Sequence, residues 1–223
     1  MAYYDRVNTE LKQKLYAQLV IENHPIYGSS PFKEAILERP ADFNLEHLVE
    51  QMMAANSGGL YEFNDGIHED FTDESECKTG TLHTNGSMAS AEITNVRSQD
   101  GVLKRGAIRA VILNPMLEKL HFLFIPKEAV QKCMHTRKGT PTVSRSLWLR
   151  YNKVKKQFTT LEKFLSVFYQ KYPGGQVFGH NVIDVEEFDP HFDVPDYVEA
   201  VFRKKNTVTD TFNTEPLKSS EIV

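Results

Sequence analysis

At 223 residues, the chain has the length of one large domain, or of one domain with an appendage, since domains average about 100–200 residues. Hydrophobic residues make up 40% of it and charged residues 25%, which is typical of a globular protein with a sizeable core. The sequence lacks the roughly 18 consecutive apolar residues of a membrane span and the layout of a secretory signal. Its two cysteines, Cys77 and Cys133, are too few for a disulfide framework or a four-cysteine zinc site. We therefore expect a cytoplasmic protein with no membrane partner.

The first part of the chain is predicted to be helical. Leucines at helical spacing predict an amphipathic helix over residues 7–23, and a short second helix follows over residues 32–38. Asn44 is placed to cap a third helix over residues 45–55, which ends at Ser57-Gly58-Gly59.

Strands are predicted to follow. The pattern of β-favouring residues and turn signals places them over residues 60–64, 76–83, 91–96, 107–114 and 120–125. The last two are so apolar that we expect burial on both faces, as in a sheet with helices packed against it. The predicted fold class is α/β (α+β), with a central mixed β-sheet flanked by helices.

The second half of the chain is predicted to hold a short helix over residues 127–134, a strand over 143–151 and a helix over 160–172 that Thr160 can cap. Residues 1–172 are thus expected to form the core of the domain. Residues 173–223 are rich in loop signals and acidic, and we expect them to form an appendage of the same domain.

Charge is distributed unevenly along the sequence. Residues 1–96 contain 6 Lys/Arg and 16 Asp/Glu, residues 97–163 contain 15 and 4, and residues 164–223 contain 5 and 10. The whole chain carries a net charge of −4, which conceals this basic middle segment. Such a segment is typical of a surface that binds a polyanion. The alternative is that these basic side chains are solvated, are matched by acidic neighbours and bind no polyanion.

The run from Asp70 to Glu76-Cys77-Lys78 is the candidate catalytic motif. Side chains alternate along a strand, so Glu76 and Lys78 are expected on one face and Cys77 on the other. If Asp70 ends a preceding strand, a tight hairpin would bring it opposite Glu76. A surface ion pair between Glu76 and Lys78 is the plain structural alternative.

Two carboxylates and an ammonium in this arrangement suit metal-assisted phosphodiester hydrolysis. Asp70 and Glu76 are suitable ligands for Mg²⁺, with Mn²⁺ as a possible substitute, and the backbone carbonyl of Cys77 is a third possible ligand. Lys78 is placed to orient or deprotonate the attacking water and to stabilise the transition state.

On these residues, and on the order of helices and strands over residues 44–134, the chain resembles the PD-(D/E)xK nuclease superfamily, and within it type II restriction endonucleases. The resemblance implies a restriction-endonuclease-like fold, Mg²⁺ bound by Asp70 and Glu76, and Lys78 as the catalytic lysine. It also implies an acidic residue from the preceding helix, for which Glu50 is the first candidate and Glu62 the second. Asp65 is a rival to Asp70 as first metal ligand, whereas Asp73 is too close to Glu76 to lie across a hairpin.

The segment 135–156 is the candidate DNA-contacting region, because its basic residues are interleaved with Ser, Thr and aromatic residues. Arginine suits guanine and lysine suits phosphates. Arg150 and then Arg145 are the preferred candidates for reading bases. The full candidate set is Arg137, Lys138, Ser144, Arg145, Arg150 and Lys153.

The sequence therefore predicts a Mg²⁺-dependent endonuclease for double-stranded DNA, most simply a sequence-specific type II restriction enzyme. A palindromic target would call for a homodimer. The alternative is a non-catalytic DNA-binding or phage accessory protein in which Glu76 and Lys78 form a structural pair.

Overall fold

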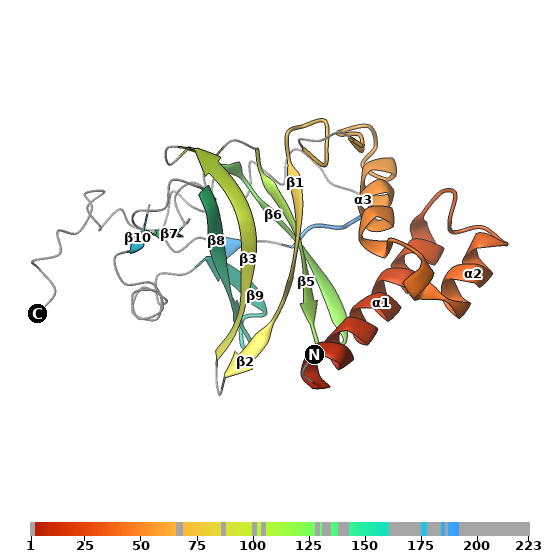
Figure 1. The fold of residues 1–223 in the computed structure, drawn as a ribbon, viewed down its shortest axis with the longest axis horizontal. Coiled ribbons are helices and arrows are strands. Elements are labelled where there is room, and N and C mark those ends of the chain that lie inside the picture. Colours follow the sequence, from red (N-terminus) through yellow and green to blue (C-terminus); the bar gives the residue numbers. More distant parts are fainter. Residues whose placement is uncertain are drawn as a thin grey trace, which may run out of the picture.

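The computed structural model describes residues 3–65, 69–85, 88–99, 102–103, 106–127, 130, 135–137, 143–160, 175–177, 184–185 and 187–191. These residues form three layers (Figure 1): helices on one side, a three-stranded sheet in the middle and a larger sheet on the other side. The predicted mixture of helices and strands is confirmed. The sequence predicted one central sheet, and the structure has two.

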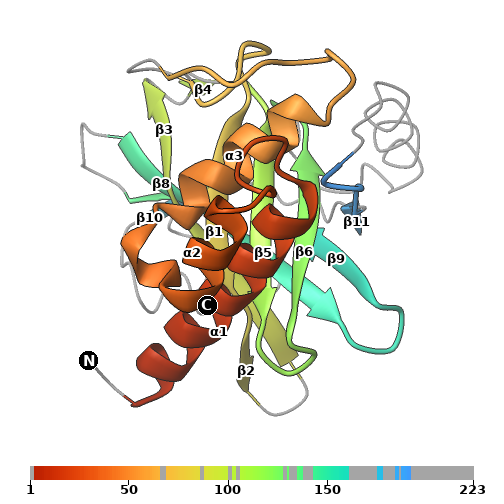
Figure 2. The same ribbon diagram turned by 90° about the vertical axis from the view of Figure 1, so that its right-hand side faces the viewer.

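The helical layer contains α1 (Tyr3–Asn23), α2 (Phe32–Glu38), the 3₁₀ helix η1 (Pro40–Asp42) and α3 (Leu45–Ala55). The third helix has the predicted bounds, and the Asn44 side chain accepts a hydrogen bond from the backbone N–H of His47 at 3.4 Å, as expected of an N-cap. Seen from the helical side, α1 and α3 lie in front of the three-stranded sheet (Figure 2). Within the described part of the chain, no helix combines the length and the hydropathy needed to cross a membrane.

The middle sheet consists of β1 (Glu76–Thr81), β5 (Ile108–Asn114) and β6 (Lys119–Ile125), in the order β1-β5-β6. β1 is parallel to β5, and β5 is antiparallel to β6. Every residue of β5 is buried, as its apolar sequence predicts. Ile108, Ala110 and Ile112 pack towards the larger sheet, and Val111 packs among the helices. One face is therefore covered by helices as expected, whereas the other face is covered by a second sheet.

The larger sheet takes its strands from both sides of β5 and β6 in the sequence. Its path is β10-β7-β8-β3-β2, with β9 also paired to β8, β11 to β9 and β4 to β3. The chain passes from the middle sheet into this one at Leu82, a buried residue between β1 and β2. The strands are β2 (His83–Asn85), β3 (Met88–Gln99), β4 (Val102–Leu103), β7 (His135–Arg137), β8 (Val143–Asn152), β9 (Gln157–Thr160), β10 (Gly175–Val177) and β11 (Asp184–Val185).

Some predicted elements differ or lie outside the described residues. The strand expected over residues 60–64 is absent from this described segment, where a single bridge joins Phe63 to Phe71. Most of the helix predicted over residues 127–134 lies outside the described residues. So does the helix predicted over residues 160–172, apart from Thr160, which ends β9. Of the predicted appendage, only residues 175–177, 184–185 and 187–191 are described.

A buried arginine joins the middle sheet to the turn before β1. Arg109 of β5 is 4% exposed, and its Nη2 donates to Asp73 Oδ2 at 2.6 Å while its Nε donates to Ser75 Oγ at 2.9 Å. The guanidinium carbon lies 3.9 Å from the ring centroid of Tyr61 and 4.8 Å from that of Phe124. A guanidinium removed from water in this way depends on its carboxylate partner and on the faces of these rings.

Removal of that carboxylate charge is expected to destabilise the fold. Asp73→Asn keeps the shape of the side chain but removes the carboxylate charge that accepts from the buried Arg109 guanidinium, so we expect the free energy of unfolding to fall by about 3 kcal/mol. Denaturant unfolding measures this change. Asp42→Asn is the matched control, because the Asp42 carboxylate is 60% exposed and lies 3.5 Å from an exposed Arg39. Equal effects of the two substitutions would contradict a structural role for the buried pair.

Candidate functional site

Asp70 reaches the start of β1 through a tight turn. The backbone N–H of Glu74 donates to the carbonyl of Phe71 at 3.1 Å, and Glu74 has a φ of 65°. The Asp73 carboxylate accepts the backbone N–H of Ser75 at 3.0 Å, so Asp73 serves the turn and Arg109. Asp70 Oδ2 accepts the backbone N–H of Cys77 at 2.7 Å. Asp70 does not end a strand, which was the condition for the hairpin considered from the sequence, but the turn still places its carboxylate at β1.

The Asp70 carboxylate lies along the edge of β1 that faces away from β5. Glu76 donates its backbone N–H to Ala107 of the segment leading into β5, at 2.9 Å, so the backbone groups of Glu76 point to β5. Those of the next residue, Cys77, point to the opposite edge, where Asp70 accepts the N–H. The carbonyl of a strand residue points to the same side as its N–H. Asp70 and the Cys77 carbonyl therefore share one edge, and no strand among the described residues pairs with β1 there.

Glu76 and Lys78 lie on one face of β1, as the alternation predicted. Their register partners on β5, Ile108 and Ala110, belong to the core between the two sheets. Lys78 Nζ and Glu76 Oε1 form an ion pair, and the two side chains are 19% and 6% exposed. This is a largely buried pair rather than a surface contact.

Cys77 points to the opposite face, into the core beneath the helices. Burial, with the negative charges of Glu50 and Asp70, raises the pKa of its thiol well above the ordinary value. The thiol is therefore protonated and packs as a small apolar side chain.

Glu50 of α3 joins Asp70 on the helical side of β1. Burial, followed by the charges of Asp70 and Glu46, raises the pKa of Glu50 to about 7, against the lowering effects of Cys77 and Lys78. Its Oε2 lies 3.7 Å from Nδ1 of His47. Glu62, the second candidate for the helix acid, and Asp65, the rival of Asp70 as first metal ligand, are both exposed. The helix acid that the resemblance implied thus has Asp70 and Lys78 within electrostatic range.

The structure brings these groups together only in part. Asp70 and Glu50 approach from the edge and the helical side of β1, whereas the Glu76 carboxylate is held by Lys78 on the other face. Among the described residues, no three His, Cys, Asp or Glu side chains are close enough to hold a metal ion. A ligand set that included Glu76 would draw its carboxylate from the face of β1 opposite Glu50.

The predicted DNA-contacting residues are only partly described. Leu147 and Leu149 of β8 are fully buried, whereas Trp148 and Arg150, which alternate with them along the strand, are half-buried. Lys153 is exposed in the turn between β8 and β9, beside the exposed Lys155 and Lys156. Lys138 and the side chains of Arg137, Ser144 and Arg145 lie outside the described residues.

A second buried polar cluster was not identified from the sequence. The Asn114 amide nitrogen lies 3.0 Å from His121 Nε2, and His121 Nδ1 contacts the Glu187 carboxylate. Burial, followed by the charge of Lys119, lowers the pKa of His121 to about 4. A neutral ring with its proton on Nδ1 satisfies both contacts. This cluster connects residues 187–188 to β6, where the Phe188 N–H donates to the carbonyl of Phe122 at 2.9 Å. Glu187 lies far from His121 in the sequence, so no local pattern predicts their contact.

Compared with protein-family models, curated proteins and solved structures, the chain has no significant match. The function must therefore be inferred from the chain's own residues. Two arrangements bear on it: the carboxyls of Asp70 and Glu50 beside the Cys77 edge, and the Glu76–Lys78 pair on the adjoining face.

The raised pKa of Glu50 predicts a pH effect on stability. The ordinary value is 4.5 and the folded value is about 7, so between these pH values the unfolded chain gives up this proton first and stability falls as pH rises. At about 1.4 kcal/mol for each pH unit, the loss approaches about 3 kcal/mol. Glu50→Gln removes the titrating carboxyl and with it this loss of stability. The variant should therefore gain stability relative to wild type as pH rises from 4.5 to above 7.

Denaturant midpoints at both ends of that pH range measure the gain. Glu62→Gln is the control, since its carboxyl is exposed. A stability difference between Glu50→Gln and wild type that does not change with pH would contradict the assigned pKa.

Proposed function

We propose that the chain is a metal-dependent nuclease that hydrolyses phosphodiester bonds in DNA, with its reaction centre at the start of β1. The observation that carries this proposal is the 2.7 Å hydrogen bond from Cys77 N–H to Asp70 Oδ2. It holds a carboxylate beside a backbone carbonyl at the edge of the strand that bears Glu76 and Lys78. The carboxyl of Glu50 adds a third oxygen-bearing group on the helical side.

The donor set fits a hard divalent cation such as Mg²⁺ in kind, since it consists of carboxylate and carbonyl oxygens. Burial, followed by the charge of Asp70, raises the pKa of Glu50, and a bound cation would favour the ionised form of this carboxyl. When bound, Mg²⁺ or Mn²⁺ would make a water more acidic and offset charge on the phosphate. Asp70, Glu50 and the Cys77 carbonyl would hold the ion, with Glu76 as a further carboxylate on the adjoining face.

Lys78 has a separate role in this proposal. Its side chain is 19% exposed, and its ammonium lies next to Glu76 and close enough to Glu50 to lower the pKa of that carboxyl. A positive charge in this position stabilises the additional negative charge that a phosphodiester develops in the transition state. The same ammonium can hold the attacking water in place by a hydrogen bond.

The substrate in this proposal is double-stranded DNA. Double-stranded DNA is favoured by the basic segment 97–163, and within it by the exposed Lys153, Lys155 and Lys156 on one turn. Cutting at a short palindromic site, as in type II restriction endonucleases, would require a homodimer with a two-fold axis. A restriction-endonuclease-like core belongs to the same proposal.

One observation favours the alternative, a DNA-binding protein without catalysis. The Glu76–Lys78 pair is largely buried, and a buried pair is as well suited to fixing β1 against the larger sheet as to chemistry. In that case the pair would stabilise the fold and no hydrolysis would accompany DNA binding.

Cleavage of plasmid DNA separates the two functions. Wild type should cut with Mg²⁺ and not with EDTA, and Lys78→Ala should lower the rate by roughly 100-fold to 1,000-fold, since one transition-state charge partner is lost. DNA binding should remain. Lys119→Ala, an exposed strand lysine outside the site, is the control. Unchanged cutting by both Lys78→Ala and Glu76→Gln would rule out this site.

The same assay identifies the first carboxylate. Asp70→Asn should abolish cutting and Asp65→Asn should preserve it, because Asp70 contacts Cys77 and Asp65 is exposed. The opposite result would assign the role to Asp65. Discrete fragments rather than a smear would show that cleavage is sequence-specific.

A further inference from the structure

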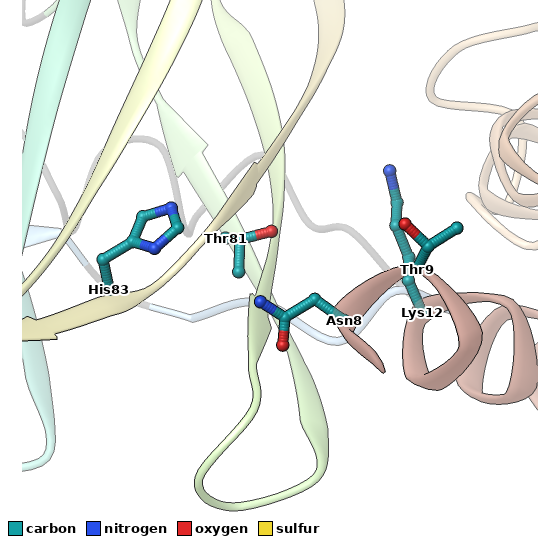
Figure 3. A pocket seen from close by; sticks show the side chains of 5 residues that line it. All are labelled: Asn8, Thr9, Lys12, Thr81 and His83. Atoms are coloured by element: carbon teal, nitrogen blue, oxygen red, sulfur yellow. The ribbon is translucent and has the colours of Figure 1, made fainter. Parts of the chain in front are cut away.

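A small cavity of about 280 Å³ lies where the chain passes from β1 to β2 (Figure 3). Asn8, Thr9 and Lys12 line it from α1, and Thr81 and His83 line it from the two strands. All five residues are polar, and none is acidic. The cavity lies at the opposite end of β1 from Asp70.

The chemistry of this lining suits an oxyanion. The amide of Asn8, the hydroxyls of Thr9 and Thr81, and the ring of His83 are hydrogen-bond donors of the kind that contact phosphate oxygens. Figure 3 shows the Lys12 ammonium directed away from Asn8 and His83. It pairs with Glu46 and lies 3.5 Å from the Thr79 hydroxyl. Neutral donors bind phosphate less strongly than charged groups do. This lining therefore suits a phosphate that belongs to a larger molecule bound elsewhere on the protein better than a free anion.

The cavity and the candidate reaction centre are joined by one face of β1. Cys77, Thr79 and Thr81 alternate onto the helical side, where Cys77 interacts with Glu50 and Thr79 contacts Lys12. The four residue-to-residue steps from Cys77 to Thr81 span about 13 Å of extended strand. A length of this order separates backbone phosphates that lie a few nucleotides apart on one strand of DNA.

We propose that this cavity binds a backbone phosphate of the same DNA strand whose scissile phosphate lies at Asp70, a few nucleotides away. The proposal rests on the nuclease function given above and adds a second contact that sets the direction of the strand along β1. The cavity is a positioning site, because its residues touch the substrate away from the reacting atoms.

Duplex binding in EDTA tests the cavity without requiring cleavage. We expect the double substitution Asn8→Ala with Thr81→Val to weaken binding of a short labelled duplex by about tenfold, since hydrogen bonds to one phosphate are lost. Fluorescence anisotropy at fixed ionic strength measures the affinity. Thr84→Val, on β2 and outside the cavity, is the matched control and should bind as wild type does. Thermal unfolding of each variant establishes that it is folded.

A second measurement distinguishes a strand phosphate from free phosphate. Inorganic phosphate is titrated while the ring signals of His83 are followed by NMR. Signals that move at low phosphate concentration, together with unchanged duplex binding by the double variant, would overturn the proposal in favour of a free-anion site. Weaker duplex binding by the double variant, with phosphate effective only at high concentration, supports it.

The outcomes for the cavity and for the nuclease function are separable. Weaker binding by the double variant in a protein that never cuts DNA would keep the cavity as a phosphate contact and reject the nuclease. Normal binding by the double variant in a protein that cuts with Mg²⁺ would reject the cavity and keep the nuclease. A wild type that binds no duplex would overturn the cavity proposal together with its premise.

Discussion

The buried contact between Arg109 and Asp73 determines where the candidate reaction centre lies. Arg109 comes from β5, in the middle of the protein, and its guanidinium holds the turn over residues 71–75 through Asp73 and Ser75. Gly106, just before β5, lies so close to this turn that a side-chain carbon would be 2.4 Å from the Glu74 carbonyl oxygen. Because a buried guanidinium without its carboxylate is costly, the turn has little freedom to move away from β5. Asp70 precedes this turn and is therefore held at the edge of β1.

The position of β1 at the edge of its sheet explains how one short strand can serve several purposes. One face of β1 carries the Glu76–Lys78 pair towards the core between the sheets, and the other face lies under α1 and α3. Its outer edge, along which no described strand pairs with it, presents backbone groups that an interior strand would use for pairing, and one of them is taken by Asp70. An edge strand next to a helical layer therefore allows side chains from both faces and backbone groups from the edge to meet at one substrate.

The elements that the sequence predicted well are those governed by local interactions. The bounds of α3 follow from Asn44 and from the spacing of its apolar residues, and both depend on neighbours within one or two turns. The common face of Glu76 and Lys78 follows from strand alternation alone. The strand expected over residues 60–64 failed for the opposite reason, because Tyr61 packs against Arg109 and Phe71 across the fold. Strand propensity is readily overridden by such packing.

The sequence by itself determined the helices at the start of the chain, the two apolar strands, the alternation of Glu76, Cys77 and Lys78, and the candidacy of Asp70 and Glu50. The tertiary structure alone decided that a second sheet covers β5, that Asp73 serves Arg109 and that Glu50 lies near Asp70. It also brought Asn8 of α1 into one cavity with His83. These relations join residues far apart in the chain, so they depend on how the layers pack and on the cost of burying charge. Local sequence patterns indicate neither how the layers pack nor which charges become buried.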